Sequence, residues 1–424
     1  MEIARTKYSG RAIVAICSLV YFASYFTRKG FAATMTGMIS AGVIDKTMGG
    51  FIGMGLFICY GVGQLISGYL GDKIKPRDLI LIGLGMSCVC NLLMPLVSSS
   101  ALMIPIWALN GLAQAMLWPP IVRMLSDSLD HERFVRANLL VTSAAHAATI
   151  ILYLYVPVCL KFFTWQVVFF TASSLALFVL LIFTVAMSLI VKEKGEKAPS
   201  TTTIPAPVST KRAEDFGVFF KRAVGAGLIP ILVAIVTMGF LRDGIESWLP
   251  TLYSEAFGRD ASESVLVSVL LPIFSVLSIS VITVLHRSPL FGNEVRGSLV
   301  IFTLAALTCI PLSILITAEA SFIRIICLVL AALVCGFMHA INFLLISCLP
   351  GRFSGMGRSA TASGFCNACV YIGAAISMYG IAATSNFGWN VTAMTWIGIA
   401  AIGAVAAFVA LKFYTKFITK DTIL

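Results

Sequence analysis

Two adjacent basic residues, Arg28 and Lys29, lie in a run from Ala12 to Ala41 that is otherwise free of charge. A helix of that length is more than long enough to cross the hydrocarbon core of a bilayer. A basic side chain near the centre of such a helix costs about 2.5–3.5 kcal/mol on insertion scales, so it normally faces a polar cavity or an opposite charge. The nearest acid in the sequence, Asp45, lies beyond the run. The sequence therefore predicts that these bases bind an anion from outside the chain, because the chain itself supplies no acid nearby.

The composition indicates a polytopic membrane protein. Hydrophobic residues make up 59% of the chain, charged residues only 12%, and the mean hydropathy is +0.96. The net charge of +11 would suggest nucleic acid as a partner of a soluble protein. In a membrane protein an excess of bases in the cytoplasmic loops explains it better, so we expect a lipid bilayer and no nucleic acid as partner. The first apolar run is too long for a signal peptide and carries two bases, so we expect no cleavable signal.

Twelve apolar segments predict an all-α membrane protein of twelve transmembrane helices in two pseudo-symmetric six-helix bundles. The one long polar stretch, 192–222, is rich in Pro, Ser and Thr and reads as a flexible cytoplasmic linker. It separates an N-terminal bundle, 1–191, from a C-terminal bundle, 223–424, which is a transporter layout. The predicted segments are 12–39, 48–71, 78–97, 101–125, 137–160, 165–191, 224–253, 264–285, 297–317, 321–349, 359–382 and 391–415.

The distribution of Lys and Arg predicts the orientation. With the N-terminus in the cytoplasm, 23 of the 30 bases fall in cytoplasmic segments, 4 on the opposite side and 3 within the membrane. This asymmetry follows the positive-inside rule. We therefore expect a monomeric, multi-pass protein of the inner or plasma membrane with both termini in the cytoplasm.

The third intramembrane base is Arg242, in the segment 224–253, at about the depth of Arg28 in its own segment. Corresponding helices of a repeated transporter meet around a midplane site, so the two guanidinium groups are expected to face one another. Two forked donors suit an oxyanion such as phosphate. The alternative is a structural ion pair between Arg242 and Glu246, one turn away. Lys29 lies about 100° around the helix from Arg28. We expect it either to contribute to the electrostatic field at the anion site or to snorkel, with its ammonium group reaching toward the membrane surface.

Three tyrosines are candidates for the same cavity. Tyr21, Tyr25 and Arg28 follow one another at spacings of four and three residues, which places them on one helical face. This predicts that both phenols line the cavity, with ordinary aromatic packing as the alternative. Tyr371, in the segment 359–382, is the third candidate.

Two histidines lie within apolar segments, His146 in 137–160 and His339 in 321–349. A membrane-embedded histidine is either a hydrogen-bonded structural residue or a group that responds to protons or anions, and for His339 the sequence leaves both open. The sequence shows no nucleophile–base constellation and no zinc-type pairing of cysteines with histidines. We therefore expect no enzyme, no metal and no cofactor.

The loop after the second segment carries a candidate for conformational gating in Gly68, Asp72 and Arg77. A carboxylate at a helix end with bases beyond it forms charge-assisted contacts that hold in one conformation only. The counterpart loop in the second half, around His286 and Arg287, lacks the acid. Within the fourth segment, Trp118-Pro119-Pro120 predicts a kink.

These residues carry a family resemblance that extends over nearly the whole chain. The loop from Gly68 to Arg77 resembles the signature between the second and third helices of the major facilitator superfamily. Within it, the run from Tyr21 to Phe31 is similar to the first helix of the organophosphate:phosphate antiporters, which include bacterial glycerol-3-phosphate and hexose-6-phosphate transporters. The run from Leu241 to Trp248 is similar to their seventh helix, and Trp118-Pro119-Pro120 and Ala145-His146 recur in their fourth and fifth.

The resemblance implies that Arg28 and Arg242 bind phosphate, that His146 assists, and that an organic phosphate is exchanged for inorganic phosphate by alternating access. Two departures bear on the substrate. Gln64 stands where the family has a lysine, and Ser247 stands where the family has an acid, with Glu246 displaced by one. The loss of one positive charge leaves open a less charged phosphate ester or another organic anion, such as a carboxylate or sulfonate.

Two other functions remain open at this point. A membrane sensor of an external phosphorylated metabolite would share the same binding site, as a sensor within the family does. An exporter of organic cations would carry intramembrane acids without a matching basic pair. Here the intramembrane bases outnumber the unpaired acids, which argues against the exporter.

Overall fold

The computed structural model describes residues 7–195, 216–318, 320–356 and 358–421, and these residues are nearly all helical, with no strand among them. Eleven helical spans are long and apolar enough to cross a membrane. The 28-residue helix α2 (Lys46–Lys73) is a further long helix between the first two of them. Together they give twelve spans, which confirms the predicted all-α fold.

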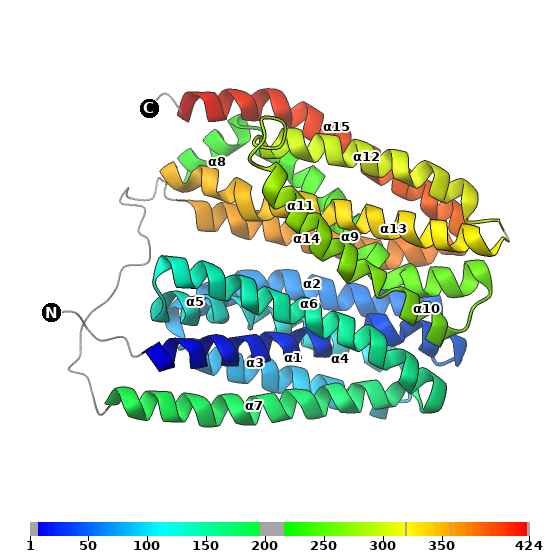
Figure 1. The fold of residues 1–424 in the computed structure, drawn as a ribbon, viewed down its shortest axis with the longest axis horizontal. Helices are drawn as coiled ribbons and strands as arrows, with labels where there is room; N and C mark the ends of the chain where they lie inside the picture. The colour runs from blue at the N-terminus through cyan, green and yellow to red at the C-terminus, as the bar shows by residue number, and fades with distance from the viewer. Residues whose placement is uncertain (1–6, 196–215, 319, 357, 422–424) are drawn as a thin grey trace.

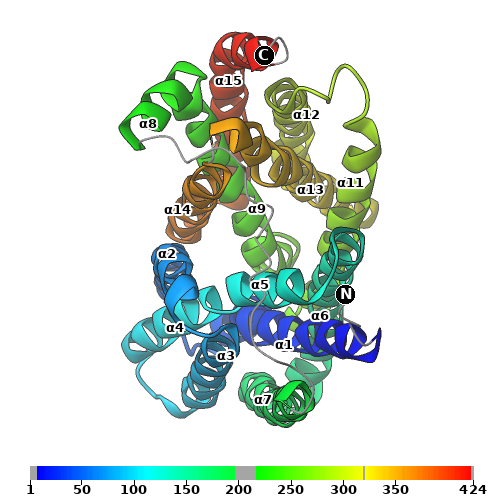
Figure 2. The same ribbon diagram turned by 90° about the vertical axis from the view of Figure 1, so that its left-hand side faces the viewer.

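The two halves of the chain form two layers, and both chain ends lie at the same end of the molecule (Figure 1). Figure 2 looks along the helices from that end. The first half consists of α1 (Lys7–Ser40), α2, α3 (Pro76–Leu93), η1 (Met94–Leu96), α4 (Ser100–Ala115), α5 (Trp118–Ser128), α6 (His131–Phe162) and α7 (Trp165–Gly195). The second half consists of α8 (Phe216–Gly225), α9 (Leu228–Phe257), α10 (Ala261–Val267), α11 (Leu270–Leu285), α12 (Glu294–Leu315), α13 (Ser321–Asn342), η2 (Phe343–Cys348), η3 (Leu349–Met356), α14 (Ser359–Ser385) and α15 (Trp389–Asp421).

The fourth span is broken where the sequence predicts a kink. Helix α4 ends at Ala115 and α5 begins at Trp118, with prolines at its first positions. Proline has no backbone N–H to donate and fits best in the first turn of a helix, so the pair starts a new helix here.

The ends of the predicted linker are helical. Helix α7 continues to Gly195 and α8 starts at Phe216, so residues 192–195 and 216–222 belong to helices instead of a flexible segment. The rest of 192–222 lies outside the described residues. The division into bundles at 191 and 223 stays a prediction.

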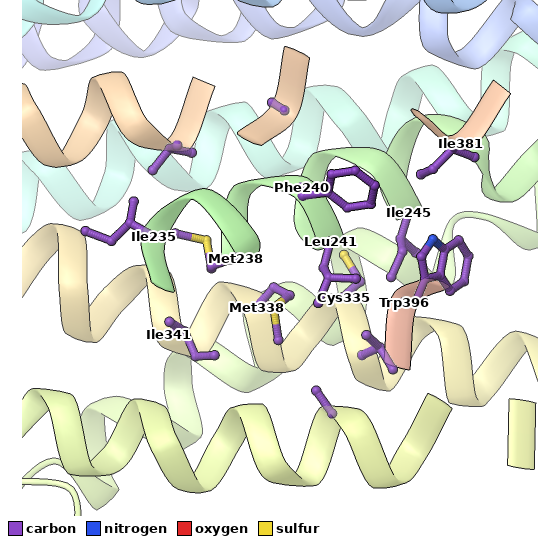
Figure 3. Close-up of a cluster of buried hydrophobic side chains, with 14 of the residues drawn as sticks. Ile235, Met238, Phe240, Leu241, Ile245, Cys335, Met338, Ile341, Ile381 and Trp396 are labelled. Atoms are coloured by element: carbon purple, nitrogen blue, oxygen red, sulfur yellow. The ribbon is translucent and has the colours of Figure 1, made fainter. Parts of the chain in front are cut away.

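Helix α9 is the central element of the second half. In its most apolar stretch 67% of the residues are buried, compared with 33–50% in the other candidate spans. Figure 3 shows Leu241 and Ile245 of α9 packed among side chains that include Met338 of α13. Such burial fixes the rotation of α9 about its axis, and with it the direction of the polar residues in its middle turn.

The two halves are tied together at the end of the molecule opposite the chain termini. Lys46 Nζ, at the start of α2, lies 3.0 Å from Glu255 Oε2, near the end of α9. Trp389 Nε1 donates to the same carboxylate oxygen at 3.0 Å. Closer to the centre, the hydroxyls of Thr36 and Thr251 lie 2.9 Å apart. The bonds of Thr36 and Lys46 join α1 and α2 to α9, and the bond of Trp389 joins α15 to the same carboxylate of α9.

Helices α2 and α14 form a close seam across the two halves. A Cβ atom added at Gly50 would lie 2.8 Å from the carbonyl oxygen of Met378, so only glycine allows this approach. Further along the seam, the rings of Phe51 and Tyr379 lie 5.0 Å apart. The rings of Tyr60 and Tyr371 follow at 4.3 Å. The seam thus leads from the tied end to the middle of α2.

The predicted gating residues are described only in part. Gly68 and Asp72 fall within α2, but the side chain of Asp72 lies outside the described residues, and Arg77 is half-buried in the first turn of α3. In the second half, Glu294 at the start of α12 is 1% exposed and accepts hydrogen bonds from Arg352 Nε and Tyr414 Oη, both at 2.9 Å. This acid lies beyond the loop around His286 and Arg287, in α12, so the prediction that the loop itself lacks an acid is not affected.

The contact between Lys46 and Glu255 predicts a local effect of Glu255→Gln. Removing the carboxylate charge weakens the bonds to Lys46 and Trp389, so backbone amides near the ends of α2 and α9 should exchange with deuterium several-fold faster. Hydrogen-exchange mass spectrometry measures this. Glu263→Gln is the matched control, because Glu263 pairs with Arg259 within one half. Equal exchange at these ends in both variants would contradict the tie between the halves.

Candidate functional site

A buried polar network holds the middle of α1 against α3 and α4. Ser24 Oγ donates to Gln114 Oε1 at 2.6 Å, and Gln114 Nε2 donates to Thr27 Oγ1 at 2.9 Å and to Ser87 Oγ at 2.8 Å. All four residues are at most 2% exposed. Buried polar groups are stable only when paired, so this network fixes the register of α1 in the turn just before Arg28.

Arg28 is surrounded by aromatic rings. Its Cζ lies 4.3 Å from the ring centroid of Tyr25 and 5.3 Å from that of Tyr60. Tyr60 is in turn packed on Tyr371. These contacts stabilise a cation through the ring quadrupole, but they do not neutralise it. Among the residues that the structure describes, no carboxylate forms an ion pair with Arg28.

Tyr21 lies one layer further from the guanidinium. Its ring centroid is 5.0 Å from that of Tyr25 and 4.7 Å from that of Trp118, at the break between α4 and α5. The two tyrosines share a helical face, as their spacing indicates. Tyr25 contacts Arg28 directly, whereas Tyr21 packs between two aromatic neighbours, as the alternative interpretation had it.

Arg242 is held by two oxygen atoms of the second half. Its Nη1 donates to Asn342 Oδ1 at 2.6 Å, and its Nη2 donates to Asp243 Oδ2 at 2.7 Å. The alternative of an ion pair between Arg242 and Glu246 is wrong, because the neighbouring Asp243 takes that place. The guanidinium of Arg242 is thus partly neutralised and oriented, in contrast to that of Arg28.

Lys29 pairs with Glu246 across the two halves, through its Nζ and the carboxylate Oε2. On the other carboxylate oxygen, His339 Nε2 donates at 2.8 Å, and Tyr153 donates to the backbone carbonyl of Glu246 at 3.2 Å. The interpretation of Lys29 as a snorkelling residue is therefore wrong, whereas its contribution of charge to the site stays a prediction. The expectation that the chain supplies no acid is wrong for Lys29.

His146 has one ring nitrogen occupied and one available. Its Nδ1 lies 2.9 Å from the carbonyl oxygen of Thr142. Because a carbonyl can only accept, Nδ1 carries the proton, and Nε2 of the neutral ring is an acceptor. The ring lies close enough to His339 for an electrostatic interaction between the two. This places His146 beside the cluster of Lys29, Glu246 and His339.

Tyr371 lies near both arginines. The charges of Arg28 and Arg242 both act on its phenol, and its ring packs on Tyr60. Gln64 lies one turn of α2 beyond Tyr60 and is half-exposed. The residues of both halves that the sequence singled out therefore lie around one central region.

One group of side chains has the composition of a metal site. Glu246, Cys335 and His339 offer ligand atoms within 4.8 Å of one another, and the last two share a face of α13. The ammonium of Lys29 already lies on the Glu246 carboxylate, in the place of a second cation. We therefore assign no metal to this cluster.

Two residues of the site were missed by the sequence analysis, and each had a weak signal. Tyr60 precedes the candidate Gln64 by one helical turn, and Asn342 follows His339 by three residues. Both spacings place a residue on the face of a candidate. Neither shows which side chain reaches an arginine of another helix.

Comparison with known proteins agrees with this architecture. Residues 17–378 match the family model of the Major Facilitator Superfamily. The chain belongs to this superfamily. Its long apolar helices are those of a multi-pass membrane protein, as predicted.

The similar curated proteins confirm the resemblance to organophosphate:phosphate antiporters. A "Probable hexose phosphate transport protein" of Chlamydia trachomatis is 36% identical over 120 residues, which are 28% of this chain and 26% of that protein. The "Membrane sensor protein UhpC" of Escherichia coli is 31% identical over 29% of this chain and 28% of that protein. The "Glycerol-3-phosphate transporter" of Bacillus subtilis is 27% identical over 58% of this chain and 57% of that protein. The matched segments thus span about a quarter to just over half of these relatives.

Solved structures support the fold. A bacterial homologue of the human lysosomal transporter Spinster, in an inward-facing and unoccupied conformation, aligns with a TM-score of 0.73. The alignment covers 97% of this chain and 99% of that one at 12% sequence identity. At this identity the likeness concerns the fold alone.

The Lys29–Glu246 pair predicts a non-additive effect on stability. Lys29→Met leaves a buried carboxylate without its cation and should cost about 3 kcal/mol of unfolding free energy, and Glu246→Gln should likewise destabilise. The double variant removes both charges and should be close to the wild type. Thermal unfolding midpoints of the purified protein in detergent measure this.

Lys161→Met is the control for this experiment, because Lys161 is an exposed base at the end of α6. Its loss should change stability by no more than about 0.5 kcal/mol. If the double variant instead loses the sum of the two single effects, Lys29 and Glu246 are not energetically coupled.

Proposed function

We propose that this protein is a secondary active transporter of an organic anion that works by alternating access. We further propose that the anion is a phosphate ester and that it is exchanged for inorganic phosphate. The observation that carries the proposal is the guanidinium of Arg28 in the middle of a membrane helix, which pairs with no carboxylate of the described residues. An intramembrane charge without a protein partner is costly and marks a ligand pathway. The similarity to phosphate-ester transporters supports phosphate as the charged group.

The arrangement of the two arginines supports alternating access. Arg28 belongs to the first half and Arg242 to the second, and Tyr371 interacts with both. An anion bound by both guanidinium groups would draw the halves together around the site. A ligand shifts a conformational equilibrium only through such differential affinity for one state. His146 would modulate that affinity with its protonation.

The tied end of the molecule supports a particular orientation. The halves are joined at the end opposite the chain termini, and the positive-inside rule puts both termini in the cytoplasm. The structure would then be closed toward the outside of a plasma or inner membrane. In the opposite state, contacts of Gly68, Asp72 and Arg77 would hold the cytoplasmic side. We expect the protein to work as a monomer.

A second candidate function is a membrane sensor, which the similarity to UhpC favours. A sensor would use the same residues to bind an external phosphorylated metabolite without moving it across the membrane. A transporter of a carboxylate or sulfonate is the remaining alternative, because the arginines recognise any oxyanion.

Counterflow of radiolabelled phosphate in proteoliposomes tests the proposal, with glycerol-3-phosphate and glucose-6-phosphate as competitors. Arg28→Gln should reduce exchange about 100-fold, because two charge-assisted hydrogen bonds are worth roughly 3 kcal/mol. Arg28→Lys should recover only part of it, because the ammonium keeps the charge but lacks the fork.

Arg133→Gln is the control for the transport assay, since Arg133 is exposed at the start of α6 and should exchange phosphate like the wild type. Phosphate binding without exchange would support the sensor over the transporter. Wild-type behaviour of Arg28→Gln would refute the anion site at Arg28. The absence of both phosphate binding and phosphate exchange would refute phosphate as the ligand.

A further inference from the structure

The buried charges of the central region sum to one positive charge, which one negative charge on the ligand would neutralise. Within the middle of the membrane spans the chain places three bases and two acids. Lys29 pairs with Glu246, and Arg242 pairs with Asp243. With both histidines neutral, the net charge of this set is one positive, and it resides on Arg28.

The side chains that contact Arg28 are neutral. Tyr25 and Tyr60 contact the guanidinium, and Tyr371 packs on Tyr60. Gln64, which follows Tyr60 by one turn of α2, is also uncharged. Phenol and amide groups can donate hydrogen bonds to an anion without adding positive charge. Additional oxygen atoms of a ligand can therefore be bonded here, whereas an additional negative charge finds no further unpaired cation among the side chains that the structure describes in this region.

The pair of Arg242 and Asp243 limits the second guanidinium. Asp243 is 6% exposed, and its carboxylate lies 2.7 Å from Nη2 of Arg242. A second ligand charge drawn to Arg242 would have to compete with this carboxylate in the same buried place. Like charges confined at low dielectric repel strongly, so such a dianion would bind only with an accompanying proton.

We infer that the site selects phosphate groups that carry a single negative charge, namely phosphodiesters and the singly protonated form of monoesters. This inference rests on the proposed function and narrows its substrate class. Two residues set this selectivity for singly charged phosphate groups. Asp243 neutralises the charge of Arg242, and Gln64 adds no charge of its own.

The test compares two small phosphates whose charges differ. Methyl phosphate passes from a monoanion to a dianion near pH 6, whereas dimethyl phosphate stays a monoanion. Binding of each to the purified full-length protein is measured between pH 5 and pH 8. The dissociation constant of methyl phosphate should rise about 100-fold relative to that of dimethyl phosphate, because about 1% of the monoester is singly charged at pH 8.

Dividing the dissociation constant of methyl phosphate by that of dimethyl phosphate at each pH corrects for changes in the charge of the protein itself. The groups concerned are His146 on α6 and His339 on α13, which lie near Lys29, Glu246 and Arg242. A change in their charge alters the binding of both probes, whereas the second ionisation of the ligand alters only that of methyl phosphate.

Charge-adding variants identify the residues responsible. Gln64→Lys and Asp243→Asn each raise the net charge of the site by one. In each variant the dissociation constant of methyl phosphate, relative to that of dimethyl phosphate, should therefore rise less than 10-fold between pH 5 and pH 8, instead of about 100-fold. Ser126→Lys is the matched control, because it adds the same charge at an exposed position near the end of α5 and should leave the ratio unchanged.

The outcomes separate this inference from the proposed function. Methyl phosphate that binds as tightly as dimethyl phosphate at pH 8 would overturn the charge selectivity and leave the phosphate site standing. An unchanged ratio in both Gln64→Lys and Asp243→Asn would also overturn it. The absence of binding of both probes at every pH would overturn the proposed phosphate site together with the inference.

Discussion

Burial of charge in the interior of a membrane is the constraint on which this structure depends. Each buried ion costs several kcal/mol unless a partner compensates it. Two of the three intramembrane bases meet this constraint within the chain, Arg242 with Asp243 and Lys29 with Glu246. Arg28 meets it only in part, through the rings of Tyr25 and Tyr60. Of the three bases, Arg28 is therefore the one whose charge is left without a carboxylate among the described residues.

The same constraint links the charges to conformation. Arg242 and Asp243 belong to one helix, so their pair can persist when the halves move. Lys29 and Glu246 belong to different halves, as do Lys46 and Glu255, so those pairs exist only where α1 and α2 lie close to α9. Packed interfaces of this kind are bistable, which suits a protein that changes the side on which its halves touch.

The sequence was sufficient for the fold and for the identity of the central arginines. Apolar run lengths predicted twelve spans, and Trp118-Pro119-Pro120 predicted the break between α4 and α5. The sequence was insufficient to predict that Lys29 pairs with Glu246, because these residues are 217 positions apart in the chain. Spacing along one helix favoured Arg242 as the partner of Glu246, but helix spacing says nothing about a neighbour from the other half. Tyr60 and Asn342 were missed for the same reason, since each contacts an arginine of another helix.

The central claim is that Arg28 provides the free positive charge of an anion site. Perrhenate, a tetrahedral monoanion with strong anomalous scattering, tests it most directly in crystals of the protein. We expect an anomalous peak within hydrogen-bond distance of the Arg28 guanidinium, and its loss in crystals of Arg28→Gln. A peak at another position, or one that persists beside residue 28 in Arg28→Gln, would show that Arg28 does not bind the anion.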